Sequence, residues 1–156
     1  MTKPDFIYTT YIKTTAEKLW QALTTPEFTR QYWGHDNVSQ WTKGSEWKHV
    51  DPENEQVKIV GMVLESDPPN RLVLSWASPN DPSDDSQVSF EIVQVEDMVR
   101  LDVVHGKFKA GSPMRENVSA GWPRVLSSLK SFLESGQGIN VWAGYEKDCG
   151  SVRKAS

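Results

Sequence analysis

The sequence predicts an α+β domain in which a curved antiparallel sheet of about six to seven strands packs around one long C-terminal helix. Three observations lead to this class. Segments with strand character follow one another through the middle of the chain, helical periodicity is confined to both sides of that run, and the length of 156 residues suits one domain. A sheet with one apolar face needs a cover, and only the C-terminal helix is long enough to supply it.

The first strand and the two short helices after it carry clear local signals. Residues 6–13 alternate and are rich in Tyr, Thr and Ile, which predicts a strand. Thr14 or Thr15 can then cap a first helix. Pro26 begins a second helix at a position that tolerates its missing N–H, and Gly34 ends that helix. The first helix presents one apolar stripe, made of Ala16, Leu19, Trp20 and Leu23.

The middle of the chain predicts further strands separated by turns. They are expected at residues 38–41, 45–50, 57–65, 71–76, 86–95 and 99–105. In the third of these, a β-bulge is expected near Gly61, because Lys58 and Glu65 would otherwise point to opposite faces of an apolar strand. Residues 78–86 hold two Pro, three Asp and three Ser, which predicts an exposed loop.

The last part of the chain predicts a loop, a long helix and an extension. Residues 107–117 contain Gly, Pro and mixed charge, as loops do. Apolar residues then recur at three and four positions, and Gly136 follows as a helix C-cap. These apolar residues are Trp122, Val125, Leu126, Leu129, Phe132 and Leu133. We therefore expect residues 1–137 to form one domain, and residues 138–156 to be an extension that is packed against it or partly flexible.

The composition argues against several classes of function. The chain has 17 basic and 21 acidic residues, a net charge of −4 with no basic patch, so no nucleic-acid partner is expected. No apolar run reaches the ~20 residues that cross a membrane and no signal peptide precedes the first strand, so we expect a cytoplasmic protein without membrane insertion. The single cysteine, Cys149, predicts a free thiol. No metal-binding, nucleotide-binding or hydrolase motif occurs, so neither a metal nor a cofactor is expected.

Four segments resemble one known family in the same order along the chain. Residues 16–24 (AEKLWQALT) are similar to the first helix of the START-like, or SRPBCC, helix-grip superfamily. In the branch named after the activator of the Hsp90 ATPase, residues 67–76 (DPPNRLVLSW) resemble a turn and strand, and residues 100–108 (RLDVVHGKF) the last strand. Residues 121–130 resemble the start of its long helix. The resemblance implies a helix-grip fold with a cavity for small apolar molecules; some members of the superfamily are cyclases and others carry lipids or hormones.

The expected function is the binding of a small hydrophobic ligand in a cavity between the sheet and the C-terminal helix, without chemistry of the protein's own. Many aromatic residues, including most of the seven tryptophans, fall at element ends or on the expected concave face. The candidate ligand-binding residues are Trp33, Trp41, Trp47, Val60, Met62, Leu74, Trp76, Phe90, Val103, His105, Phe108, Trp122 and Leu126. Ordinary core packing is the alternative interpretation for each of them.

A small enzyme of the cyclase or hydrolase type is the first alternative. His105 shares a strand face with Leu101 and Val103, and an inward histidine is the one candidate for an acid or base. The other two histidines, His35 and His49, are expected at the surface.

Interaction with another protein is the second alternative. An Hsp90-related role follows from the resemblance, but we expect it less, because no segment here is free to form the co-chaperone's N-terminal domain. A homodimer is expected if Trp142 or Tyr145 in the extension is exposed, since exposed aromatic patches mark interfaces.

Overall fold

A computed structural model describes residues 4–145 of the chain. Within these residues it contains one strand, two short helices, six further strands and one long helix, so the predicted α+β class is confirmed. In chain order the elements are β1 (Phe6–Ile12), α1 (Ala16–Thr24), α2 (Pro26–Trp33), β2 (Asp36–Ser39), β3 (Glu46–Val50), β4 (Val57–Asp67), β5 (Arg71–Ser78), β6 (Asp81–Val95), β7 (Met98–Gly106) and α3 (Met114–Ser135). Cys149 and residues 146–156 of the predicted extension lie outside the described part.

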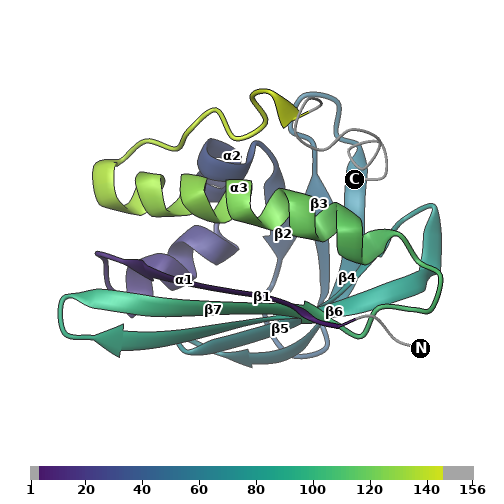
Figure 1. Ribbon diagram of the computed structural model, residues 1–156, viewed down its shortest axis with the longest axis horizontal. Coiled ribbons are helices and arrows are strands. Elements are labelled where there is room, and N and C mark those ends of the chain that lie inside the picture. Colours follow the sequence, from purple (N-terminus) through teal and green to yellow (C-terminus); the bar gives the residue numbers. More distant parts are fainter. Residues whose placement is uncertain (1–3, 146–156) are drawn as a thin grey trace.

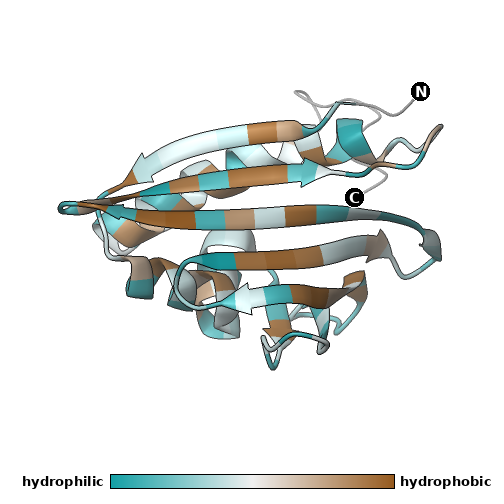
Figure 2. Cartoon of the chain, turned by 90° about the horizontal axis from the view of Figure 1, so that it is seen from below, coloured by the Kyte–Doolittle hydropathy of each residue, from teal (hydrophilic) through white to brown (hydrophobic). Residues whose placement is uncertain are grey.

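The described strands form one antiparallel sheet in the order β1-β7-β6-β5-β4-β3-β2. The chain meanders from β2 to β7, and β7 then pairs with β1, so that Ile7 lies opposite Val104. The sheet curves around α3, which crosses its concave side, while α1 and α2 lie towards one end (Figure 1). Hydrophobic and hydrophilic residues alternate along the central strands (Figure 2), as a sheet with one buried face requires.

The helix ends follow the local signals of the sequence. Thr15 caps α1, because its hydroxyl accepts the N–H of Lys18 at 3.2 Å. Gly34 and Gly136 end α2 and α3 in the left-handed conformation, with φ of 85° and 87°. These boundaries were predicted, since capping depends only on residues within one helical turn.

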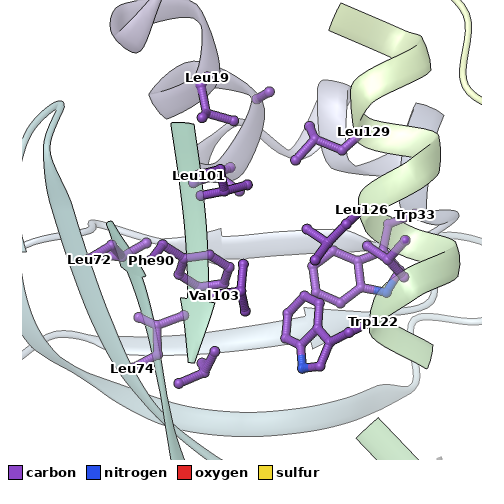
Figure 3. Packing of buried hydrophobic residues seen from close by; sticks show 14 of the residues in the cluster. Leu19, Trp33, Leu72, Leu74, Phe90, Leu101, Val103, Trp122, Leu126 and Leu129 are labelled. Atoms are coloured by element: carbon purple, nitrogen blue, oxygen red, sulfur yellow. The ribbon is translucent and has the colours of Figure 1, made fainter. Parts of the chain in front are cut away.

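One apolar core lies between α3 and the sheet. Helix α3 contributes a stripe of buried residues, namely Val118, Trp122, Val125, Leu126 and Leu129. The strands contribute buried residues from their concave side, among them Leu72, Leu74, Val88, Phe90, Leu101 and Val103. Figure 3 shows Trp122, Leu126 and Leu129 beside α3, opposite strand residues such as Leu72, Phe90 and Val103. The predicted cover of the sheet by the C-terminal helix is therefore confirmed.

The loop predicted over residues 78–86 is wrong. Strand β5 continues further than expected, and β6 begins after a turn of two residues. Pairing then jumps from Ser78–Asp81 to Ala77–Asp85, so that Pro82 has no partner in the ladder. A proline is tolerated at such an irregular site because the ladder needs no hydrogen bond from it.

Helix α3 begins at Met114, so the loop expected up to Asn117 is too long. The hydroxyl of Ser112 accepts the N–H of Met114 at 3.1 Å and satisfies one of the free donors at the helix start. Met114 and Val118 lie one turn apart and both line the inner side of the helix. The charged residues between them hide this short apolar repeat in the sequence.

Strand β4 turns the opposite face to the core from the one predicted. Ile59 and Val63 pack in the core, whereas Met62 is 39% exposed. The expectation that Val60 and Met62 point inward to bind a ligand is therefore wrong. Both faces of this strand are apolar in the sequence, so alternation alone could not distinguish them.

Gly61 in β4 makes room for a buried tryptophan. The indole Nε1 of Trp47 donates to the backbone carbonyl of Ser75 at 2.7 Å. A Cβ atom on Gly61 would lie 1.9 Å from that carbonyl oxygen and 2.4 Å from Nε1, so only glycine fits. The bulge predicted near Gly61 lies instead between Val63 and Glu65.

Residues 138–145 run back over α3 towards β3 and β4 (Figure 1). Val141 and Tyr145 are buried by this packing. Nε1 of the half-buried Trp142 donates to the carbonyl of Trp33 at 3.1 Å. This part of the predicted extension is thus packed on the domain, and its two aromatic side chains are used inside the chain rather than as an exposed patch.

Candidate functional site: a tryptophan-lined cleft

A cleft of about 830 Å³ lies between the first half of α3, the adjoining ends of β3, β4 and β5, and residues 138–145. Four indoles line it, and three of them pack together as an apolar wall: Trp33 from α2, Trp76 from β5 and Trp122 from α3; the fourth is Trp142. Their ring centroids are 5.4 Å (Trp33–Trp122), 5.5 Å (Trp76–Trp122) and 6.3 Å (Trp33–Trp76) apart. Figure 3 shows Trp33 and Trp122 side by side next to α3. This three-indole wall suits a flat apolar molecule.

Two histidines line the cleft beside Trp33. The ring centroid of His49 lies 4.6 Å from that of Trp33 and 4.6 Å from that of His35. Nδ1 of His49 donates to the side-chain oxygen of Asn37 at 2.5 Å, which leaves Nε2 as the acceptor of a neutral ring. The expectation that His35 and His49 are surface residues is wrong, because His49 is buried and His35 is half-buried in the cleft.

Both histidines of the cleft are uncharged at neutral pH. Burial lowers the pKa of His49 well below its ordinary value, and a charge on His35 would lower it further. Burial also lowers the pKa of His35, against a partial opposing effect of the Trp33 backbone and the Asp51 carboxylate. Nδ1 of His35 is buried and has no hydrogen-bond partner among the described residues.

Asp84, near the start of β6, places a carboxylate in the lining of the cleft. Its Oδ2 accepts the hydroxyl of Ser112 at 2.7 Å. Its Oδ1 is shielded from solvent and has no hydrogen-bond partner in the described part of the chain. An oxygen of this kind is costly to leave without a donor.

His105 lies behind the three-indole wall rather than in the cleft. The ring is fully buried; its Nδ1 accepts Nε1–H of Trp122 at 3.0 Å, and its Nε2 donates to the hydroxyl oxygen of Ser86 at 2.7 Å. Burial lowers the pKa of His105 to about 3, so the ring is neutral at physiological pH. His105 therefore positions Trp122 and is not among the residues that line the cleft.

The predicted ligand-binding residues fall into four groups. Trp33, Trp76 and Trp122 line the cleft. Trp41, Trp47, Leu74 and Phe90 surround a second void of only about 10 Å³, next to Trp33 and Trp76. Val103, His105, Phe108 and Leu126 are buried in the core and line neither space. Val60 and Met62 belong to the outward face of β4.

The polar residues of the cleft were missed by the sequence analysis. They come from turns and element ends far apart in the chain, and they include His35, His49, Asp51, Lys58, Asp84 and Asn117. A local signal existed only for His49, which shares a face of β3 with the buried Trp47. Within residues 4–145 no three His, Cys, Asp or Glu side chains are grouped as metal ligands, so these residues offer hydrogen bonds and charge.

The sequence matches the model of one protein family, described as activator of Hsp90 ATPase homolog 1-like protein, over residues 13–134. The chain belongs to this family. The match includes the whole three-indole wall, and it confirms the resemblance stated from the sequence. No curated protein sequence matches this member of the family. Among its described residues, no helix is long and apolar enough to cross a membrane.

Solved structures confirm the helix-grip fold of this family member. CalU16 from Micromonospora echinospora has a TM-score of 0.70 at 22% identity, with 97% of this chain and 86% of that chain covered. The Aha1 dimer from Colwellia psychrerythraea has a TM-score of 0.73 at 25% identity, covering 87% of this chain and 100% of that one. DynU16, from the dynemicin biosynthetic locus, has a TM-score of 0.70 at 17% identity, covering 87% and 49% respectively.

Proposed function

We propose that the tryptophan-lined cleft binds a small hydrophobic ligand with a flat body. The observation that carries this proposal is the three-indole wall, whose centroids are 5.4–6.3 Å apart beside a space of about 830 Å³. This volume lies in the range of small-molecule sites, which combine apolar walls with a few polar groups. The histidine pair and Asp84 supply such groups at the edge of the wall.

Family membership supports the same proposal. Relatives in the wider superfamily include both ligand carriers and cyclases. Catalysis through His105 has less support in this chain, because the ring is fully buried and both of its nitrogens are hydrogen-bonded within the protein. A carrier or sensor role is therefore favoured over acid–base chemistry at that residue.

Filling the cleft is expected to weaken ligand binding without unfolding the chain. Gly121 of α3 lines the cleft, and the nearest atom to a Cβ placed there is a ring carbon of Trp142 at 3.9 Å. Leucine at this position would add four carbon atoms to the space that a ligand needs. We expect Gly121→Leu to weaken binding of 2-naphthalenemethanol at least ~10-fold, measured by quenching of tryptophan fluorescence.

The matched control adds the same side chain to the solvent side of the same helix. Ser127 is exposed on α3, so Ser127→Leu is expected to bind the probe as the unmodified chain does. Equal binding by Gly121→Leu and Ser127→Leu, or no binding of any flat hydrophobic probe by the unmodified chain, would contradict the proposal. Native mass spectrometry of the purified protein can identify a molecule that copurifies in the cleft.

The interaction hypotheses remain predictions. One similar structure is described as a dimer, and the family description refers to the Hsp90 ATPase. Sedimentation equilibrium tests the homodimer, and an assay of Hsp90 ATPase stimulation tests the chaperone interaction. A monomer at all concentrations and an unchanged ATPase rate would exclude the two respectively.

A further inference from the structure

We infer that the ligand of the tryptophan-lined cleft is a cationic amine with a flat apolar body, and that its nitrogen binds at Asp84. This inference rests on the proposed ligand-binding function and adds the charge and orientation of the ligand. It follows from the state of the Asp84 carboxylate, from the balance of charge in the cleft and from the indoles beside it.

Among the described residues, the carboxylate of Asp84 has no cationic partner, and only one of its two oxygens accepts a hydrogen bond. Only Oδ2 has a donor, the hydroxyl of Ser112, whereas Oδ1 has none among the described residues. The neighbouring Asp85 differs, because it forms an ion pair with Lys109 at 3.1 Å on the surface. A carboxylate held away from solvent favours a positively charged donor, since charge-assisted hydrogen bonds are roughly twice as strong as neutral ones.

The other charged residues of the cleft leave this negative charge uncompensated. Asp51 and Lys58 both line the cleft beside the histidines, and their opposite charges cancel. Nζ of Lys58 donates to the side chain of Gln56 at 3.2 Å. His35 and His49 hold no charge at neutral pH because burial lowers the pKa of each ring. Among the described residues that line the cleft, the net charge is therefore that of Asp84.

The three-indole wall lines the same cleft as this carboxylate. Ser86, two residues after Asp84 in β6, is directly opposite Trp76 in the β5–β6 ladder. An ammonium group near Asp84 therefore comes close to an indole, whose face attracts cations when solvent is excluded. The carboxylate can turn about its Cβ–Cγ bond, a torsion with a broad range, and so present an oxygen to the cleft. An anionic ligand with the same apolar body would meet repulsion instead.

The test compares three probes that share one ring system and differ in charge. They are 2-naphthylmethylamine, 2-naphthalenemethanol and 2-naphthoic acid, each titrated at pH 7 by isothermal calorimetry. We expect the amine to bind roughly 10-fold more tightly than the alcohol, and the acid to bind most weakly. In Asp84→Asn the ratio of amine to alcohol affinity should fall to about one, while Asp85→Asn should keep the ratio of the unmodified chain.

Different results of this titration would contradict this inference and the proposed function. The cleft binds ligands, but the positive charge inferred for the ligand is wrong, if any of three results is found. These results are equal binding of the three probes, tightest binding of the acid, or an Asp84→Asn protein that keeps the preference for the amine. If none of the three binds, the proposed function itself fails and this inference fails with it.

Discussion

Gly61→Ala is expected to destabilise the protein by about 3 kcal/mol or more. The added Cβ would lie 1.9 Å from the carbonyl oxygen of Ser75 and 2.4 Å from Nε1 of Trp47. Neither atom can move away from the added methyl group without a large cost in free energy. The carbonyl belongs to the backbone of β5, which pairs with β4, and the indole is fully buried and donates to that same carbonyl. The substitution must therefore either separate two central strands or break a buried hydrogen bond.

Thermal unfolding followed by circular dichroism measures this cost. For a chain of this size we expect the Tm to fall by roughly 10 °C. Gly121→Ala is the control, because it adds the same methyl group with no atom closer than 3.9 Å. In the interior of α3 that change should raise stability by about 0.5–1 kcal/mol. A Gly61→Ala protein as stable as the unmodified chain would show that the close approach of Trp47 is wrong.

The protein is expected to lose stability as the pH falls below about 6.5, because buried histidines must then take up protons when it unfolds. Burial lowers the pKa of His105 to about 3, against about 6.5 in an unfolded chain. Between these values the unfolded state binds one more proton at this residue, so stability is full above pH ~6.5 and declines as the pH falls towards 3. His105 alone would cost about 2 kcal/mol at pH 5. His49 acts in the same direction, because burial lowers its pKa as well.

His105→Gln separates this effect from general acid sensitivity. At pH 7 the variant should be less stable, because it loses the hydrogen bonds of the imidazole to Trp122 and Ser86. Its stability should depend less on pH, because glutamine does not titrate. Urea unfolding between pH 4.5 and 7.5 gives both quantities. In the unmodified protein, NMR should show no protonation of the folded His105 ring between pH 5 and 8. An identical pH slope in the two proteins would contradict the assignment.

Local signals made most of the fold predictable. The cap at Thr15, the left-handed ends at Gly34 and Gly136, and the apolar stripe around Trp122 all depend on residues within a turn or two of each other. The predictions that were wrong concern segments in which local signals conflict. Strand β4 is apolar on both faces, and the start of β6 contains proline and three aspartates although it pairs with β5.

The candidate site was predicted only in part. Three tryptophans of the wall, Trp33, Trp76 and Trp122, were in the predicted set because bulky aromatics at element ends are informative by themselves. The inward orientation predicted for His105 is confirmed, but the ring points to Trp122 and Ser86 instead of a ligand site. Strand alternation gives a face and does not tell which partner on that face a side chain meets.

By itself the sequence therefore determined the order of the elements, the helix ends and the aromatic character of the wall, because these follow from spacing and chemistry along a short stretch of chain. Only the tertiary structure decided which face of β4 is buried, why Gly61 must lack a side chain, and that His49 and Asp84 line the same cleft as Trp122. The physical reason is that these features depend on contacts between residues distant in sequence. Several arrangements are equivalent locally, and only the packing of the whole sheet around α3 makes one of them the most stable.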